Sequence, residues 1–364
     1  MPRVSKILSR FSVLSLLFLL GGCNMVVMAP SGDIAVQQRD LIIISTVLML
    51  LIIIPVIFLT LFFAWKYRQA NTDAKYDPEW HHSTRLEVVI WSAPLVIIIA
   101  LGAVTWISTH KLDPYRPLDR IDSTTPLAQD VKPLTVEVVA LDWKWLFFYP
   151  DLGIATVNEM AAPVNTPINF KITSSAVMNS FFIPALAGQI YAMPGMETKL
   201  HAVINKPGEF EGLSANYSGA GFSHMRFKFH GLDQAGFDQW VQKAKSEGSA
   251  LGRPEYLELA KPSERVPVRY FSTVDDGLYN AILNMCADPN KMCMNEMMMI
   301  DMKGGGGKES EHNRARLIYD NRDADAGGIT PAAGEAQHDD HSMPGMDMGS
   351  GMKMGGDAPA KPSN

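Results

Sequence analysis

The sequence predicts a membrane protein of mixed α and β class. We expect a two-helix transmembrane hairpin, a strand-rich domain, short C-terminal helices and a disordered tail. Residues 41–65 and 88–107 are apolar runs long enough to approach or exceed the roughly 30 Å hydrocarbon core of a bilayer. From residue 134 onward, apolar and polar residues alternate in short runs separated by Pro-Gly and Pro-Asp turns, which is typical of a β-sandwich or barrel.

The first 22 residues have the pattern of a bacterial lipoprotein signal peptide. Arg3, Lys6 and Arg10 precede an apolar stretch at 11–20 that is too short to cross a membrane. Two glycines directly precede Cys23. Lipoprotein signal peptidase requires a small residue just before the cysteine. The sequence therefore predicts a mature chain that begins at an acylated Cys23. The alternative is a short membrane anchor followed by an incidental cysteine.

The two apolar runs are predicted to span the membrane within a hairpin at 41–110. The connecting loop, 66–87, contains four basic residues, whereas the segment before the first span, 23–40, contains only Arg39. The positive-inside rule therefore places the loop in the cytoplasm and both chain ends in the periplasm. A pair of buried core helices is the alternative, and the length and lack of charge of both runs disfavour it. The predicted location is a bacterial inner membrane.

The periplasmic part is predicted to have three regions. Residues 111–230 form the β-domain, in which 134–139, 168–173, 197–203 and 225–229 alternate as strands. Residues 231–303 form a helical extension, with helices near 233–245 and 278–285. The first of these helices places Phe237, Trp240, Val241 and Ala244 on one face before Gly248. Residues 304–364, rich in Gly, Ala, Asp, His and Met, are predicted to be disordered.

Composition excludes several classes of protein. The chain has 364 residues, a net charge of −6 and no basic stripe, which argues against nucleic-acid binding. Three cysteines are too few for a disulfide-built scaffold.

Cys286 and Cys293 have six residues between them, and an oxidising periplasm favours a disulfide between the two. Metal binding is the alternative, although no histidine lies nearby in the sequence; two separate thiols are the third possibility.

Residues 216–227 have the spacing of a dinuclear copper site but not its ligands. They resemble the copper loop of cytochrome c oxidase subunit II, whose pattern is Cys-x3-Cys-x3-His-x2-Met with a carbonyl ligand between the cysteines. Asn216 and Ala220 stand at the two thiolate positions, Ser218 at the carbonyl position and Phe227 at the thioether position. Only His224 is retained, and by itself it is expected to be an ordinary polar residue.

The second copper histidine of that family is also replaced, by Asn179 in a segment that runs into Pro184. A mixed-valence copper pair needs two bridging thiolates, because soft sulfur holds copper and delocalises its charge. We therefore expect no copper centre in the barrel. The complex containing this chain must then take its electrons from a donor other than cytochrome c.

The resemblance covers about residues 23–300 and includes the segments 142–145 and 185–195. Vacant copper positions on an intact scaffold identify the chain as similar to the quinol branch of heme-copper oxidase subunit II, the cytochrome bo-type ubiquinol oxidases. This resemblance implies a cupredoxin-like Greek-key β-barrel on a transmembrane hairpin. Trp143 and Trp145 match an aromatic run that passes electrons to copper in the cytochrome c branch; here we expect them to pack as ordinary aromatic residues.

The resemblance also implies a function for the whole complex. It would oxidise ubiquinol, reduce oxygen to water and pump protons, with this chain as a non-redox subunit that supports assembly of subunit I. No cofactor is expected on this chain, because the family's hemes, copper and quinol site belong to subunit I. Smaller subunits III and IV and membrane lipid are the other expected partners.

Glu87 begins the second span at the predicted cytoplasmic face. The resemblance implies that it is a proton-uptake carboxylate, since the family keeps a subunit II glutamate here, at the mouth of a proton channel into subunit I. The alternative is a capping charge, because the helix dipole favours a carboxylate near a helix N-terminus.

The C-terminal tail suggests a second, different function. Its methionines and histidines are closely spaced in a flexible segment, and thioether and imidazole groups suit periplasmic copper(I). The candidate ligands are His338, His341, Met343, Met346 and Met348. A low-complexity tail without a role is the alternative for this segment. For the chain as a whole, the alternative to an oxidase subunit is a stand-alone, membrane-tethered periplasmic lipoprotein that handles copper.

Overall fold

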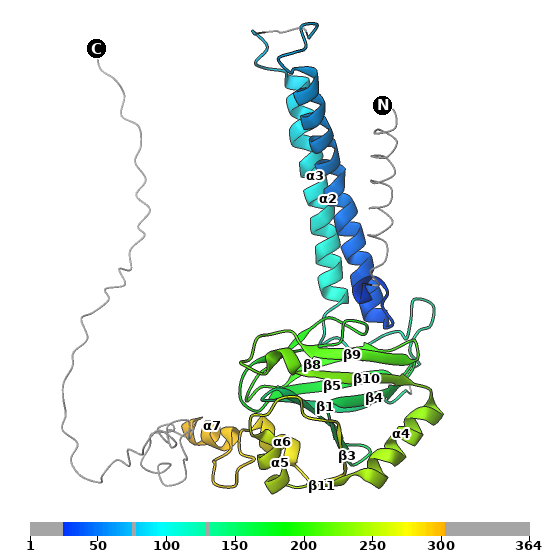
Figure 1. Ribbon diagram of the computed structural model, residues 1–364, viewed down its shortest axis with the longest axis vertical. Helices are drawn as coiled ribbons and strands as arrows, with labels where there is room; N and C mark the ends of the chain where they lie inside the picture. The colour runs from blue at the N-terminus through cyan, green and yellow to red at the C-terminus, as the bar shows by residue number, and fades with distance from the viewer. Residues whose placement is uncertain (1–24, 75–77, 129–130, 303–364) are drawn as a thin grey trace, which may run out of the picture. The chain divides into compact units, whose positions relative to one another are not determined.

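The computed structural model describes residues 25–74, 78–128 and 131–302 (Figure 1). Two long helices, α2 (Asp33–Lys66) and α3 (Thr84–Lys111), follow a short 3-10 helix, η1 (Val26–Met28). Both long helices are apolar enough to cross a membrane, and none of the residues in their most apolar windows is buried. Such exposure of apolar side chains is expected for helices that contact lipid or another membrane subunit. The two predicted spans are therefore present as helices.

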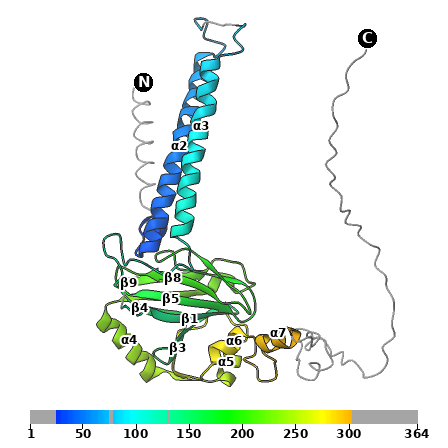
Figure 2. The ribbon, with the colours of Figure 1, turned by 180° about the vertical axis from the view of Figure 1, so that it is seen from behind.

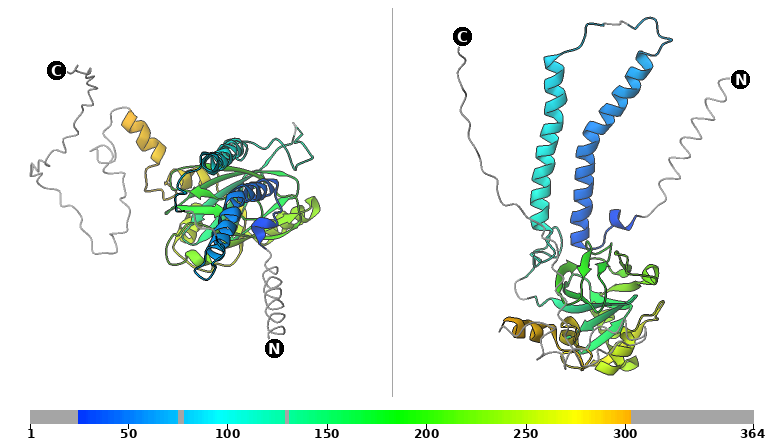
Figure 3. Two further views of the ribbon diagram at one scale, coloured as in Figure 1. Left: turned by 90° about the horizontal axis from the view of Figure 1, so that it is seen from above. Right: turned by 90° about the vertical axis from the view of Figure 1, so that its left-hand side faces the viewer.

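Both helices extend beyond the apolar runs. The structure begins α2 at Asp33, eight residues before the predicted span at 41, so the segment 23–40 is partly helical. The additional turns contain polar residues, which a hydropathy pattern does not assign to a span. Pro55 lies inside α2, and Figure 3 shows the helix bending away from α3 toward its C-terminal end. A proline removes one backbone hydrogen bond and so accounts for the bend.

The β-domain, which the sequence predicts to be periplasmic, is a sandwich of two sheets. Strands in the first sheet follow the order β11-β12-β3-β2-β1-β5-β8, and those in the second follow β4-β10-β9-β6-β7. The strand bounds are β1 (Leu134–Leu141), β2 (Lys144–Tyr149), β3 (Ile154–Val157), β4 (Glu159–Pro163), β5 (Pro167–Ser174), β6 (Asn179–Phe182), β7 (Ile190–Ala192), β8 (Thr198–Val203), β9 (Gly208–Ser214), β10 (Arg226–Leu232), β11 (Ser249–Leu251) and β12 (Arg269–Val274). The four predicted strands correspond to β1, β5, β8 and β10.

The larger sheet is covered on both faces. On one face, Val138, Phe147 and Phe170 pack in the main core against residues of the second sheet such as Phe229. On the other face, Leu146 and Phe148 belong to a second core built with the C-terminal helices. Every residue of β2 is therefore buried. A strand buried on both faces has no period-two alternation, which explains why the sequence pattern did not predict it.

The C-terminal extension contains both helices and strands. Its helices are α4 (Gln234–Glu247), α5 (Arg253–Ala260), α6 (Leu278–Leu283) and α7 (Met294–Met302) (Figure 2). The α4 helix buries the four predicted residues, and the Asp233 side chain caps it by accepting a 2.8 Å hydrogen bond from the Gly236 amide. The region expected to be helical also supplies β11 and β12, which extend the larger sheet next to β3.

Candidate functional site

The six copper-type positions come together at one end of the sandwich. Asn179 begins β6, and the connection from β9 to β10 contains Asn216, Ser218, Ala220 and, in the 3-10 helix η2 (Phe222–His224), His224. The Ser214 hydroxyl at the end of β9 donates to Asn179 Oδ1 at 3.0 Å. The Asn216 amide donates to the Met178 carbonyl at 3.3 Å. Hydrogen bonds of two asparagine side chains therefore join the start of β6 to the end of β9 and the loop after it, at positions where the copper branch uses histidine and cysteine.

The Phe227 side chain fills the thioether position with an aromatic ring. It is buried and stacks against Phe181, with 5.4 Å between the ring centroids and an angle of 7° between the planes. Trp145 and Phe147 contact the same ring at centroid distances of 5.8 and 4.9 Å. On the neighbouring strand, Gly212 pairs with Phe227 in register. An aromatic cluster thus occupies the space next to the vacated ligand positions.

Replacing Gly212 by alanine is expected to destabilise the sandwich by about 1–3 kcal/mol through overpacking. A Cβ atom at this position would lie 2.0 Å from the Phe227 ring, which is buried and has no open side. Urea unfolding of the purified chain measures the loss. The double variant Gly212→Ala, Phe227→Leu should recover part of it, because the smaller side chain makes room for the methyl group. Unchanged stability in the single variant would refute this account of the packing.

The His224 imidazole and the Ser218 carbonyl already have hydrogen-bond partners. Arg265 contacts His224 Nε2 at 3.0 Å, and because a guanidinium can only donate, the imidazole lone pair must accept. The Ser218 carbonyl, at the family's carbonyl-ligand position, accepts a 3.0 Å hydrogen bond from Trp143 Nε1. Trp143 has a left-handed backbone, with φ of 68°, and its ring packs over Gly219 and Gly221. Trp143 therefore covers the vacated loop from outside.

This donor set does not fit a dinuclear copper centre. It offers amides, a carbonyl and one engaged imidazole, whereas the copper pair needs two bridging thiolates. The cysteines among the described residues are Cys286 and Cys293, which form a disulfide with a Cα–Cα distance of 4.8 Å. Within the described ranges, no three His, Cys, Asp or Glu side chains are grouped in a way that could hold a metal ion.

Glu87 lies in the first turn of α3 and has a partner that the sequence reading missed. Its Oε1 atom is 2.7 Å from His82 Nδ1, and both side chains are about half exposed. The other ring nitrogen of His82 lies 3.2 Å from the Thr84 hydroxyl. The pair therefore consists of two groups that can exchange protons and that water can reach. The consecutive histidines at 81 and 82, just before a helix start, are the only signal in the sequence.

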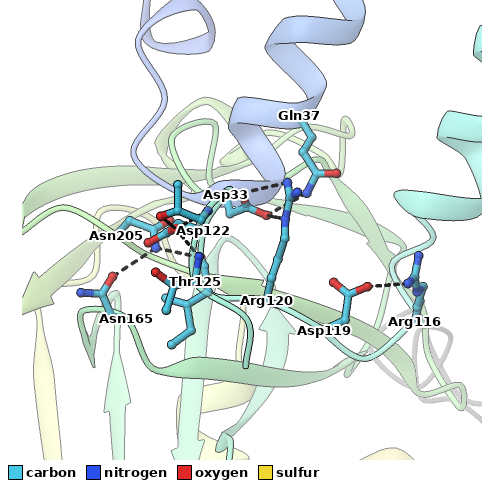
Figure 4. A network of polar contacts seen from close by, with 11 residues as sticks. Asp33, Gln37, Arg116, Asp119, Arg120, Asp122, Thr125, Asn165 and Asn205 are labelled. Carbon is cyan, nitrogen blue, oxygen red and sulfur yellow. Dashed lines mark hydrogen bonds and ion pairs between the residues drawn. The ribbon is translucent and has the colours of Figure 1, made fainter. Parts of the chain in front are cut away.

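A buried carboxylate connects the start of α2 to the periplasmic domain (Figure 4). Arg120 donates from Nε and from a terminal nitrogen to the two oxygens of Asp33, at 2.9 and 3.0 Å, and Gln37 adds a 2.8 Å bond. The Asp33 side chain is only 3% exposed, whereas that of Arg120 is 35% exposed. The backbone amides of residues 31 and 32 both donate to the Ala185 carbonyl. These bonds fix the first turn of α2 to the sandwich.

A second polar cluster joins the C-terminal extension to the sandwich. Glu159 on β4 accepts hydrogen bonds from Trp240 on α4 at 2.9 Å and from Tyr270 on β12 at 2.6 Å, and His230 on β10 lies 3.5 Å away. Burial by itself raises the pKa of Glu159, but these donors outweigh burial and lower the pKa to about 2. The ionised carboxylate on β4 therefore holds α4, β12 and β10 together at neutral pH.

Replacing Glu159 by glutamine should weaken the folded state above about pH 4.5 and matter progressively less below it. The pKa of Glu159 is lower in the folded chain than its ordinary value of 4.5, so its charge stabilises the fold above that pH. That contribution is lost as the pH falls from 4.5 toward the folded value near 2. Urea midpoints of both proteins across this range test the expectation. A difference independent of pH would show that hydrogen-bond geometry alone, without the charge, is responsible.

Several predicted site residues cannot be placed. Cys23 and the signal peptide lie outside the described residues, as do the tail ligands His338, His341, Met343, Met346 and Met348.

Comparison with known proteins gives the family. The model for the periplasmic domain of cytochrome c oxidase subunit II matches residues 150–231, and the model for the cytochrome oxidase aromatic-rich motif matches residues 245–290. The cytochrome bo(3) ubiquinol oxidase subunit 2 of Pseudomonas aeruginosa is 52% identical over 310 residues, covering 84% of this chain and 88% of that protein. The chain belongs to the subunit II family of the cytochrome bo-type ubiquinol oxidases.

A second ubiquinol oxidase subunit agrees with this assignment. The ubiquinol oxidase subunit 2 of Acetobacter aceti is 52% identical over 277 residues, covering 76% of this chain and 87% of that protein. Among solved structures, the periplasmic domain of cytochrome oxidase subunit II from Bradyrhizobium japonicum matches with 27% identity and a TM-score of 0.31, covering 33% of this chain and 96% of that one. As a bo-type subunit II, the chain has the predicted combination of two membrane helices and a periplasmic β-sandwich.

Proposed function

We propose that this chain is the non-redox subunit II of a proton-pumping terminal oxidase that oxidises ubiquinol and reduces oxygen to water. The observation that carries the proposal is the replacement of the copper ligands on an intact scaffold. Asn216 and Ala220 stand where thiolates are needed, and the Phe227 ring is packed into the adjoining core. The 52% identity to ubiquinol oxidase subunits in two bacteria supports the same function.

The proposed partners follow from this function. We expect subunit I to carry the hemes, the oxygen-reducing copper and the ubiquinol site, and smaller subunits III and IV to complete the complex. This chain would bind none of those cofactors. Its contribution is proposed to be structural, because the Asp33–Arg120 pair joins the start of α2 to the segment that follows α3 and so closes the periplasmic end of the hairpin. Glu87, with His82, is proposed to collect protons at the cytoplasmic face.

Copurification tests the proposal directly. The full chain, tagged and isolated in mild detergent, should bring with it a large heme-bearing subunit, seen as a heme absorbance spectrum and a second band. Isolation of the chain without heme, under conditions that preserve other respiratory complexes, would contradict it. That result would favour the stand-alone copper-handling lipoprotein, whose predicted ligands lie in the tail.

A lipid anchor at Cys23 is part of the same proposal. The segment just after it, Met25 to Met28, is apolar and exposed, as expected for a chain that runs along a membrane surface. Intact-mass analysis should give a chain that begins at residue 23 and carries acyl groups. Cys23→Ala should block processing yet leave the complex assembled, because two helices already span the bilayer. An unprocessed wild-type mass would refute the anchor.

A further inference from the structure

The region around α7 is unusually rich in methionine, and much of it is exposed. Seven methionines occur between residues 285 and 302. Met285, Met298, Met299 and Met302 are between 46% and 79% exposed. Methionine normally fills gaps in a core, so exposure of several thioethers together calls for a different explanation. The same stretch, from residue 275 to 302, has five acidic residues and one lysine, which makes its surroundings favourable to cations.

Two of these thioethers are held together by the fold. Met285 precedes Cys286 and Met294 follows Cys293, so the disulfide closes a loop whose two ends carry the methionines. The Met294 amide donates to the Asn284 carbonyl at 2.9 Å, which fixes the same closure. Met285 also has a left-handed backbone, with φ of 57°. Such strain in a residue other than glycine persists only where the surrounding structure enforces it.

Both sulfur atoms converge above Gly195. A Cβ atom at this glycine would lie 3.1 Å from Met294 Sδ, 3.6 Å from Met285 Sδ and only 2.5 Å from the terminal methyl of Met294. The missing side chain at residue 195 thus leaves the space in which the two thioethers meet. Met196, next to this glycine, is 54% exposed, and Met298 lies one turn after Met294 on α7. These two residues are the neighbours in sequence from which a third sulfur would come.

We propose that Met285 and Met294 form a thioether site for copper(I), clamped by the Cys286–Cys293 disulfide and separate from the vacated copper loop. Thioether sulfur is a soft donor that selects copper(I) over hard cations and needs no deprotonation to bind. The two nearby cysteines are oxidised to a disulfide in the periplasm, so they cannot bind copper(I) as thiolates. The thioethers are therefore the sulfur ligands that remain. The proposal does not depend on which electron donor the oxidase uses.

The test compares copper(I) binding by the full-length chain and its variants against the chromogenic chelator bicinchoninate. The variant Met285→Leu, Met294→Leu keeps apolar side chains of similar size and should lose one equivalent of bound copper(I). Met299→Leu is the matched control, since Met299 is exposed on another side of α7 and should leave binding unchanged. Because the tail is the same in every protein, copper bound there cancels in the comparison.

Two further variants probe the geometry. Gly195→Ala should weaken binding, because its methyl group displaces the Met294 side chain. The double variant Cys286→Ser, Cys293→Ser should also weaken copper(I) binding, because it removes the disulfide that holds the two methionines together. Silver(I), which does not change oxidation state, should compete with copper(I) for the same site. Equal copper(I) stoichiometry in wild type and in the Met285→Leu, Met294→Leu variant would overturn the proposal and leave the pair as packing residues. Equal loss in the Met299→Leu control would also overturn it, by showing diffuse binding.

Discussion

Replacing Arg120 by methionine should destabilise the subunit by about 3–5 kcal/mol, the cost of leaving a buried charge without its partner. The Asp33 carboxylate would keep only the Gln37 amide as a side-chain partner, in a site where it is 3% exposed. A loss of this size is a large share of the roughly 5–15 kcal/mol that stabilises a folded protein. We therefore expect the contact between the first turn of α2 and the segment that follows α3 to open, and assembly to fail or become temperature-sensitive.

Denaturant midpoints of the purified subunit in detergent measure this loss. Arg116→Met provides a matched control, since Arg116 pairs with Asp119 on the surface, with both side chains at least 45% exposed. Such pairs contribute at most about 1 kcal/mol. The double variant Asp33→Asn, Arg120→Met removes both charges and should recover much of the stability. If Arg120→Met cost no more than Arg116→Met, the pair would not be the connection described above.

Replacing Glu87 by alanine is expected to lower ubiquinol-oxidase turnover several-fold while leaving heme content and assembly unchanged. The carboxylate is water-accessible, next to His82 and at the start of a membrane helix, and under the proposed function it collects protons for subunit I. A merely capping charge at a helix terminus is worth only about 0.3–1 kcal/mol and would not affect turnover. Oxygen consumption by the purified complex, measured from neutral to alkaline pH, provides the readout.

Two variants separate the possible roles of Glu87. Glu87→Asp keeps an acid one methylene shorter and should retain more turnover than alanine. His82→Ala removes the paired imidazole but leaves the carboxylate, so a smaller effect is expected. Full turnover in Glu87→Ala would show that Glu87 only stabilises the N-terminus of α3 and does not take up protons. Loss of heme together with activity would instead indicate a packing role at the contact with subunit I.

Local sequence patterns predicted the two long apolar helices and the strands whose polar residues remain partly exposed. The two apolar runs predicted α2 and α3, and period-two alternation predicted β1, β5, β8 and β10. The same reasoning could not find β2, because both faces of that strand are buried and its residues do not alternate. It also placed β11 and β12 in a helical extension, since short strands that join an existing sheet edge carry little signal of their own.

Sequence spacing revealed one part of the site, the vacated ligand positions, but not the parts that depend on long-range contacts. The vacated ligand positions were found because a family pattern fixes their spacing. Arg120, by contrast, is 87 residues from Asp33, and neither residue has a local feature that identifies its partner. The Glu159 cluster likewise combines β4, α4 and β12, so its low pKa follows only from the folded arrangement. The convergence of Met285 and Met294 over Gly195 also requires the three-dimensional fold.

The most direct test of the account is the electron donor of the purified complex. Oxygen consumption should be measured side by side with a reduced ubiquinol analogue and with reduced cytochrome c, at the same enzyme concentration. With amides at Asn179 and Asn216 and an aromatic ring at Phe227, the sandwich lacks the ligands of the dinuclear copper centre that accepts electrons from cytochrome c in the other branch of the family. We predict rapid turnover with ubiquinol and none with cytochrome c above the rate without enzyme. Sustained turnover with cytochrome c would contradict the central claim.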